Sequence, residues 1–119
     1  MSNSQFPMPH PADLHWLTPD AATRAAPPIA HPYVVIRVDG ETVVACALTT
    51  NLARVNLPGN VLLDAGEGGL PRPSVVEVAK VVTVAAAQLG DRIGALTDAR
   101  MAQILAGMRF VRSYLPGDR

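Results

Sequence analysis

The sequence predicts a small, mainly β domain with one C-terminal α-helix, folded as a curved barrel of the SH3-like kind. Three observations predict this fold. β-branched residues gather in short runs, Gly and Pro separate those runs, and only the C-terminal segment carries apolar residues at helical spacing. At 119 residues, 49% of them hydrophobic, the chain is long enough for one core and one domain. We expect residues 1–11 to form a flexible tail and residues 12–116 to form the domain.

The first expected strand and the loop after it occupy residues 12–32. Residues 12–18, ADLHWLT, alternate in part between apolar and polar side chains, which predicts a short strand. Residues 18–32 contain four prolines and show no periodicity, so we expect a long loop, with Arg24 as its cation. Loops of this length are uncommon in compact domains and are often functional.

The clearest local signal predicts a β-hairpin. Residues 33–38 and residues 41–48 are two β-branched runs joined by Asp39-Gly40. That dipeptide suits the two positive-φ positions of a type I′ turn, whose twist matches that of the flanking strands. The hairpin brings the chain just before residue 33 close to the end of the second strand.

Polar side chains gather where this second hairpin strand ends. Thr49, Thr50 and Asn51 follow the apolar run directly, and Arg54 and Asn56 lie just beyond it. Hydroxyl, amide and guanidinium groups of this kind contact phosphates and base edges in nucleic-acid sites. A plain strand end with solvated side chains explains the same residues, so both interpretations stay open here.

Two or three shorter elements and a long strand are expected next. Pro58-Gly59 predicts a turn, residues 60–64 a short strand and residues 65–73 a Gly/Pro loop. Residues 74–84 predict a long strand because they are rich in valine. Residues 85–96 predict one helical turn followed by a short strand or bend.

The chain is expected to close with a helix at about residues 98–115. Thr97 can cap its N-terminus, Asp98 suits its first turn, and Pro116-Gly117 can end it. An apolar stripe should pack on the sheet, consisting of Met101, Ile104, Leu105, Met108, Val111 and Leu115. Another face predicts either a second contact surface, such as a subunit interface, or simple partial exposure, and it carries Ala106, Gly107, Phe110 and Tyr114.

Charge and cysteine content exclude several classes of protein. The 10 Lys and Arg residues balance 10 Asp and Glu residues, so the chain lacks the global basicity of a protein that grips duplex DNA. Any nucleic-acid site must therefore be a local groove. The single cysteine, Cys46, cannot form an internal disulfide, which fits a reducing, cytoplasmic compartment. We expect neither a leader peptide nor a membrane span, because no apolar run has the required length.

Several short patterns in order resemble the MazF/PemK toxins of toxin–antitoxin operons. They are HPYVVI at residues 31–36, ALTTNL at residues 47–52, PGNVLLDAGEGGLPRPSVV at residues 58–76, VVTVAAAQLGDRIGAL at residues 81–96 and the final helix. The resemblance runs from about residue 12 to about residue 115. It implies the small SH3-like barrel of the MazF/PemK (CcdB-like) type. It also implies a homodimeric, ribosome-independent endoribonuclease that cuts single-stranded mRNA and is silenced by a cognate antitoxin, with DNA contacted only through the antitoxin complex.

The resemblance also implies which residues form the site. The family has an Arg-Pro pair opening the second strand, and this chain has His31 in place of that arginine. The family's catalytic Thr or Ser falls on Thr49, with Thr50 and Asn51 beside it. An Arg and Asp pair that some members carry after the Gly-rich loop falls on Glu77 and Ala79, so that pair is absent. A later Arg-Thr-Ile-Asp pattern appears as residues 82–85, which carry no charge.

The chemistry expected of such a site needs no metal and no cofactor. The substrate's 2′-hydroxyl attacks, so the protein must accept that proton, stabilise the phosphorane charge and protonate the leaving 5′-oxygen. An unperturbed imidazole has a pKa of about 6.5 and can serve both proton steps, so His31 is a plausible substitute for arginine. Thr49 can donate a hydrogen bond to a phosphate oxygen, and Arg24 can supply a guanidinium.

Two functions follow from these residues. In the first, His31, Thr49 and Arg24 are catalytic, and Thr50, Asn51, Arg54, Asn56 and Glu77 bind single-stranded RNA. In the second, a catalytically weak relative binds RNA or its antitoxin in the same groove and acts in regulation. Without the family resemblance, His31 is interpreted as an exposed residue at the start of a strand. The sequence does not determine which RNA sequence is cut.

Overall fold

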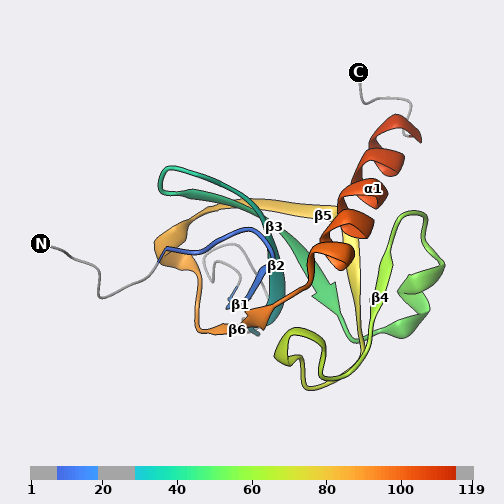
Figure 1. Ribbon diagram of the computed structural model, residues 1–119, viewed down its shortest axis with the longest axis horizontal. Coiled ribbons are helices and arrows are strands. Elements are labelled where there is room, and N and C mark those ends of the chain that lie inside the picture. Colours follow the sequence, from blue (N-terminus) through green and yellow to red (C-terminus); the bar gives the residue numbers. More distant parts are fainter. Residues whose placement is uncertain (1–7, 19–28, 115–119) are drawn as a thin grey trace, which may run out of the picture.

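The computed structural model of the chain describes residues 8–18 and 29–114, which form one antiparallel sheet and a C-terminal helix (Figure 1). The six strands follow the order β4-β5-β3-β2-β1-β6. Their bounds are Asp13–Leu17 for β1, His31–Asp39 for β2, Thr42–Thr49 for β3, Val61–Leu63 for β4, Ser74–Ala85 for β5 and Arg92–Ala95 for β6. Three 3₁₀ turns, η2 at Leu52–Asn56, η3 at Glu67–Gly69 and η4 at Ala86–Gln88, connect them, and α1 spans Asp98–Tyr114. The mainly β fold with a C-terminal helix is as predicted.

The predicted β-hairpin is present, but its turn differs from the expected type. Strands β2 and β3 pair in antiparallel register, and the last pair is Asp39 with Thr42, so the two-residue loop is Gly40-Glu41. Gly40 has φ +60°, whereas the described residues include only one non-glycine with positive φ, Ala12. The type I′ prediction is therefore wrong, because Asp39 belongs to the strand. Glycine at the first loop position is the pattern of a type II′ turn.

A bulge bends the long strand β5. On β3, the neighbouring residues Cys46 and Ala47 pair with Val81 and Glu77, which leaves residues 78–80 without partners on β3. Bulges bend a strand and increase its twist. Figure 1 shows β5 turning a corner, so that its first part pairs with β4 and its second part continues along β3. The curled, half-barrel shape of the sheet depends on this bend.

Side chains on the two faces of the sheet form two apolar clusters. The larger one lies between the sheet and α1 and includes Leu14, Val34, Cys46, Val76 and Ile104. A smaller one on the opposite face contains Val35, Val43 and Ala45. Burial raises the pKa of the Cys46 thiol to about 11, in keeping with the core role expected for this residue.

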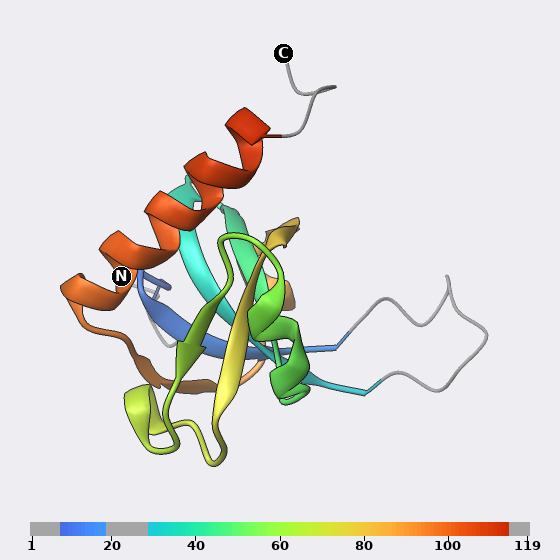
Figure 2. The same cartoon turned by 90° about the vertical axis from the view of Figure 1, so that its right-hand side faces the viewer.

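The C-terminal helix packs on the sheet (Figure 2), with one change to the described part of the predicted stripe, whose last member, Leu115, lies outside the described residues. Thr97 caps it as expected, because its Oγ1 accepts a hydrogen bond from the Arg100 N–H at 3.2 Å. Ile104 is fully buried, but Leu105 is 37% exposed, so Leu105 does not belong to the packed face. Gly107, expected on the outer face, is buried instead, and a Cβ there would lie 2.1 Å from the Gly59 carbonyl oxygen. The turn at Gly59 therefore packs directly against the helix at Gly107.

The Gly/Pro loop joins the helix and β6 to the rest of the sheet. Within η3, Glu67 forms a bidentate ion pair with the Arg100 guanidinium on α1, at 2.8 Å for each oxygen. The hydrogen bonds from Arg100 hold the pKa of the Glu67 carboxyl below its usual value. Next to it, Gly68 and Gly94 approach so closely that a Cβ on Gly94 would meet the Gly68 carbonyl. This loop therefore covers the open side of the sheet near β6.

Candidate functional site

The first part of the candidate site is a row of side chains on the face of the sheet opposite the helix. Antiparallel register places Tyr33 on β2, Ala47 on β3 and Glu77 on β5 in one row across three strands. Their sequence neighbours Val34, Cys46 and Val76 belong to the core under α1. Because side chains alternate along a strand, the row points the other way. Its middle member is a small alanine, which leaves the two polar ends of the row separated only by a methyl group.

His31 and Thr49 lie one step further along the same face. β2 begins at His31 and β3 ends at Thr49, and Thr49 pairs with Val75 on β5. The β2–β3 ladder ends at the Tyr33–Ala47 pair, two residues after His31 on β2 and two residues before Thr49 on β3, and His31 pairs with Leu17 on β1. The imidazole is exposed, whereas Thr49 is half-buried. The hairpin thus places His31 and Thr49 at the same end of the β2–β3 pair, and Thr49 is also a diagonal neighbour of Glu77 across the β3–β5 ladder.

The polar run after Thr49 folds into the short helical turn η2. The Thr49 Oγ1 accepts a hydrogen bond from the Asn51 N–H at 3.1 Å, and the Asn51 Oδ1 accepts one from the Ala53 N–H at 3.2 Å. Asn51 is therefore the N-cap of η2, a role that asparagine commonly takes. Among residues 8–18 and 29–114, no acceptor takes the Thr49 hydroxyl proton, so it can donate to a ligand. The amide nitrogen of Asn51 is likewise the part of that side chain still available to read a base edge.

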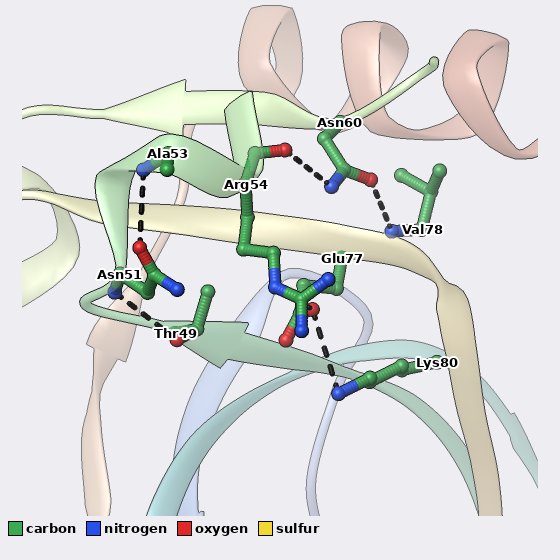
Figure 3. A network of polar contacts seen from close by, with 8 residues as sticks. All are labelled: Thr49, Asn51, Ala53, Arg54, Asn60, Glu77, Val78 and Lys80. Carbon is green, nitrogen blue, oxygen red and sulfur yellow. Dashed lines mark hydrogen bonds and ion pairs between the residues drawn. The ribbon is translucent and has the colours of Figure 1, made fainter. Parts of the chain in front are cut away.

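Glu77 is a buried carboxylate between two cations (Figure 3). Its side chain is 8% exposed. Its Oε1 lies 3.6 Å from the Lys80 Nζ and 3.9 Å from the Arg54 Nε. Lys80 reaches it from the bulge of β5, and Arg54 reaches it from η2. Of the predicted RNA-binding residues, the structure therefore brings Arg54 and Glu77 together.

Asn60 connects η2 to the bulge of β5. Its Nδ2 donates to the Arg54 carbonyl at 2.9 Å, and its Oδ1 accepts from the Val78 N–H at 3.1 Å (Figure 3). Val78 belongs to the bulge and has lost its β3 partner, so the asparagine satisfies a backbone group that would otherwise be buried without one. This side chain fixes the position of Arg54 relative to Glu77.

A pocket of about 280 Å³ opens beside Glu77. It lies where η2, the following turn, the bulge of β5 and α1 meet. Its lining is mostly apolar, with charged groups on one side, and consists of Arg54, Leu57, Pro58, Asn60, Glu77, Ala79, Lys80 and Val111. An apolar pocket with a few convergent polar groups is the usual form of a ligand site.

Tyr33 is part of the same environment. Burial raises the pKa of its hydroxyl, and the negative charge of Glu77 raises that pKa further. Tyr33 therefore stays a neutral hydrogen-bond donor over a wide pH range, at the other end of the row from Glu77. A phenol on a sheet face can also stack on a base.

The remaining predicted residues are less closely tied to this cluster. Thr50 and Asn56 are exposed, at the end of β3 and in η2 respectively. Arg24 lies outside the described residues. In the part of the chain that the structure describes, no group of three His, Cys, Asp or Glu side chains is placed to hold a metal ion.

Sequence reasoning missed Tyr33, Asn60 and Lys80. Tyr33 reads as an ordinary strand residue, and only the register with Glu77 shows its place. Asn60 and Lys80 depend on the bulge of β5, which interrupts a valine-rich run that has the pattern of a straight strand. The one sequence signal of this bulge is the position of Lys80, three residues after Glu77 within the expected strand.

Similar proteins identify the family. The model of the family described as PemK-like, MazF-like toxin of type II toxin-antitoxin system matches residues 13–111. Endoribonuclease MazF6 of Mycobacterium tuberculosis (strain ATCC 25618 / H37Rv) is 34% identical over 106 residues, which cover 84% of this chain and 93% of that protein. Endoribonuclease MazF2 of Mycobacterium bovis (strain ATCC BAA-935 / AF2122/97) is similar to the same extent.

Solved structures agree on the fold. An endoribonuclease in complex with its cognate antitoxin from a mycobacterial species aligns with a TM-score of 0.70 at 21% identity, over 90% of this chain and 97% of that one. The Mycobacterium tuberculosis toxin MazF-mt6 aligns with a TM-score of 0.69, over 85% and 96%. The described residues contain no helix long and apolar enough to cross a membrane. With the family model covering most of its length, the chain belongs to the PemK-like, MazF-like toxins of type II toxin–antitoxin systems.

Proposed function

We propose that this chain is the toxin of a toxin–antitoxin pair and an endoribonuclease that cuts single-stranded mRNA. The observation that carries the proposal is the diagonal placement of Thr49 and Glu77 on one face of the sheet, at the end of the hairpin where His31 begins β2, in a chain of this family. Relatives that are 34% identical over most of their length are named endoribonucleases, and one solved neighbour is an endoribonuclease bound to its cognate antitoxin.

The proposed reaction uses the substrate's own 2′-hydroxyl and no metal ion. His31 takes the 2′-hydroxyl proton or protonates the leaving 5′-oxygen, because it is an exposed imidazole at the edge of the face. The Thr49 hydroxyl, whose oxygen already accepts from the Asn51 N–H, donates its proton to a phosphate oxygen. Arg24, from the loop before His31, is a further candidate for stabilising the phosphorane charge.

The RNA path follows from the same placement. Thr50 and Asn51 lie directly beside the scissile phosphate held by Thr49, and Asn51 offers its amide nitrogen to a base edge. Arg54 and Asn56 lie on η2 and contact the phosphates beyond. Local cations provide the attraction, since the chain as a whole carries no net charge.

The assembly and location of the protein belong to the same proposal. A groove for several nucleotides is hard to build on one barrel of this size, and a twofold dimer extends it. A cognate antitoxin that occupies this groove silences the toxin, and any contact with DNA is made through the antitoxin complex. A reducing cytoplasm suits the buried free thiol of Cys46.

The experiment is cleavage of a long, labelled, single-stranded RNA by the purified protein in the presence of EDTA. We expect discrete cuts whose positions primer extension maps to a short recurring sequence, with cyclic phosphate at the new 3′ ends. Failure to cut any long RNA, together with retained RNA or antitoxin binding, would favour the regulatory binding protein instead. Cleavage that stops with EDTA would contradict the metal-free reaction.

A further inference from the structure

The carboxylate of Glu77 has hydrogen-bonding capacity that the described residues do not use. Its side chain is more than nine-tenths buried. Its contacts are ion pairs at 3.6 and 3.9 Å, which are longer than hydrogen bonds. A carboxylate carries about four acceptor positions, and those of Glu77 open onto the adjacent pocket, because its oxygens are not among the fully buried, unpartnered polar atoms of the described residues. Glu77 is therefore prepared for donors that come from outside the described chain.

The pocket next to Glu77 suits a flat, apolar-faced ligand with a polar edge. Leu57 and Pro58 form one apolar wall, and Val111 of α1 contributes another. Its volume of about 280 Å³ lies just below the range usual for drug-sized ligands, so it admits a single small ring system. The polar groups are Glu77 and the two cations Arg54 and Lys80, each of which has a nitrogen within 4 Å of the Glu77 Oε1.

We propose that this pocket is a base-recognition subsite that takes a base bearing an exocyclic amino group in preference to uracil. The inference rests on the proposed function and names the specificity of that site. Glu77 is a diagonal neighbour of Thr49, about 7–8 Å away by sheet geometry, so the base belongs to a nucleotide next to the scissile phosphate.

Donor and acceptor patterns explain the selection. Guanine, cytosine and adenine each present an amino group that a carboxylate accepts from, and guanine adds a second adjacent donor at N1. The adjoining acceptor, such as guanine O6 or cytosine N3, then faces the cations Arg54 and Lys80. Uracil has one donor, N3–H, between two carbonyl oxygens, and those oxygens would face the buried negative charge of Glu77. Arg54 and Lys80 can donate to one of those oxygens, but the other still faces a carboxylate that cannot donate to it, so uracil binds more weakly than the bases with an amino group.

The first test is a cleavage profile on a random-sequence RNA, read by sequencing the new ends. For the parent we expect one position beside the cut at which uridine is depleted tenfold or more. In Glu77→Gln, uridine should become accepted there, because an amide both donates to a uracil carbonyl and accepts from N3–H. This is a gain that an unfolded or inactive variant cannot mimic. Glu41→Gln, which changes an exposed hairpin carboxylate, is the matched control and should keep the parent profile.

The second test uses the parent protein and changes single atoms of the substrate. Inosine in place of guanosine, or purine riboside in place of adenosine, removes only the exocyclic amino group. At the selected position either change should weaken cleavage about tenfold, and it should have little effect elsewhere. If the parent cuts no RNA, the same preference is read by binding selection from a 2′-O-methyl RNA pool, which separates this inference from the proposed function.

Three outcomes would overturn the inference. The first is a parent profile that accepts uridine equally at every position around the cut. The second is an unchanged profile in a Glu77→Gln protein whose denaturation midpoint matches the parent. The third is a Glu77→Gln protein that alters subunit association while keeping the base preference, because the pocket would then belong to a protein interface.

Discussion

At the scale of single residues, His31 is the position where this chain departs most from the pattern its family resemblance implies. An arginine there stabilises charge well but exchanges protons poorly near neutral pH. An imidazole can exchange protons near neutral pH, and His31 is exposed at the start of β2, at the same end of the hairpin as Thr49.

We therefore expect His31→Ala to slow RNA cleavage about a hundredfold or more. Thr49→Ala should lose less and keep its affinity for RNA. His31→Arg should retain cleavage and flatten its pH dependence, whereas the parent should lose activity on both sides of an optimum near neutrality. The rates are measured on one labelled RNA across a pH series. A His31→Ala protein that cuts as fast as the parent would make the histidine a bystander and Arg24 the first candidate.

Glu67 is a second residue with a specific, testable role, in stability. Its bidentate ion pair with Arg100 holds its pKa below the ordinary value of 4.5, so the folded state favours the ionised carboxyl. The stabilisation is present above that ordinary value and is lost as pH falls through the lowered one. Glu67→Gln should cost about 1 kcal/mol of unfolding free energy at pH 7. Urea denaturation should show the difference from the parent shrinking below pH 4.5; a difference that is constant down to pH 2 would contradict this.

At the scale of elements, the hairpin and the helix follow from local sequence signals, whereas the bend in β5 does not. Gly40 and Thr97 act within a few residues of their positions, so their roles can be read from the sequence. The bulge at residues 78–80 depends on the register with β3 and on Asn60, which comes from another element. Burial of Glu77 and its meeting with Arg54 depend on that bulge, and no periodicity in a valine-rich run reveals it.

The hairpin turn offers a clean test at this scale. Gly40 has φ +60°, and no atom lies within 4 Å of a Cβ added there, so replacement meets only backbone strain. Gly40→Val should therefore cost roughly 1 kcal/mol or more, because a β-branched residue resists positive φ. Thr42→Val, at an exposed strand position two residues on, is the control and should be near neutral or stabilising. Equal denaturation midpoints for Gly40→Val and the parent would contradict the turn geometry.

At the scale of the whole molecule, the sequence predicts the fold class more completely than the site. The order of strands, loop and helix is carried by turn residues and apolar periodicity along the whole chain. The site instead arises from residues far apart in sequence, such as Tyr33 and Glu77, that one register brings into a row. Exposed apolar side chains on β4 and α1, including Leu62 at 41% and Phe110 at 51%, are features that only the folded chain displays.

Those exposed side chains lead to an expectation about assembly. A monomer that exposes large apolar residues on neighbouring elements gains free energy by covering them. We expect sedimentation of the purified protein at micromolar concentration to report a homodimer. A monomer that persists at this concentration would mean that a complete groove must form on one barrel, and it would favour the binding function over cleavage.

The central claim is that the face carrying His31 and Thr49 cuts single-stranded RNA through the substrate's own 2′-hydroxyl. The most direct measurement compares one short RNA that contains the mapped cleavage site with a copy carrying a single 2′-deoxynucleotide immediately 5′ of the scissile phosphate. The account predicts discrete cleavage of the first RNA in EDTA and no cleavage of the second at that phosphate, with similar binding of both. Cleavage of the 2′-deoxy copy at the same phosphate would contradict it, because the nucleophile would then have to come from water or from the protein.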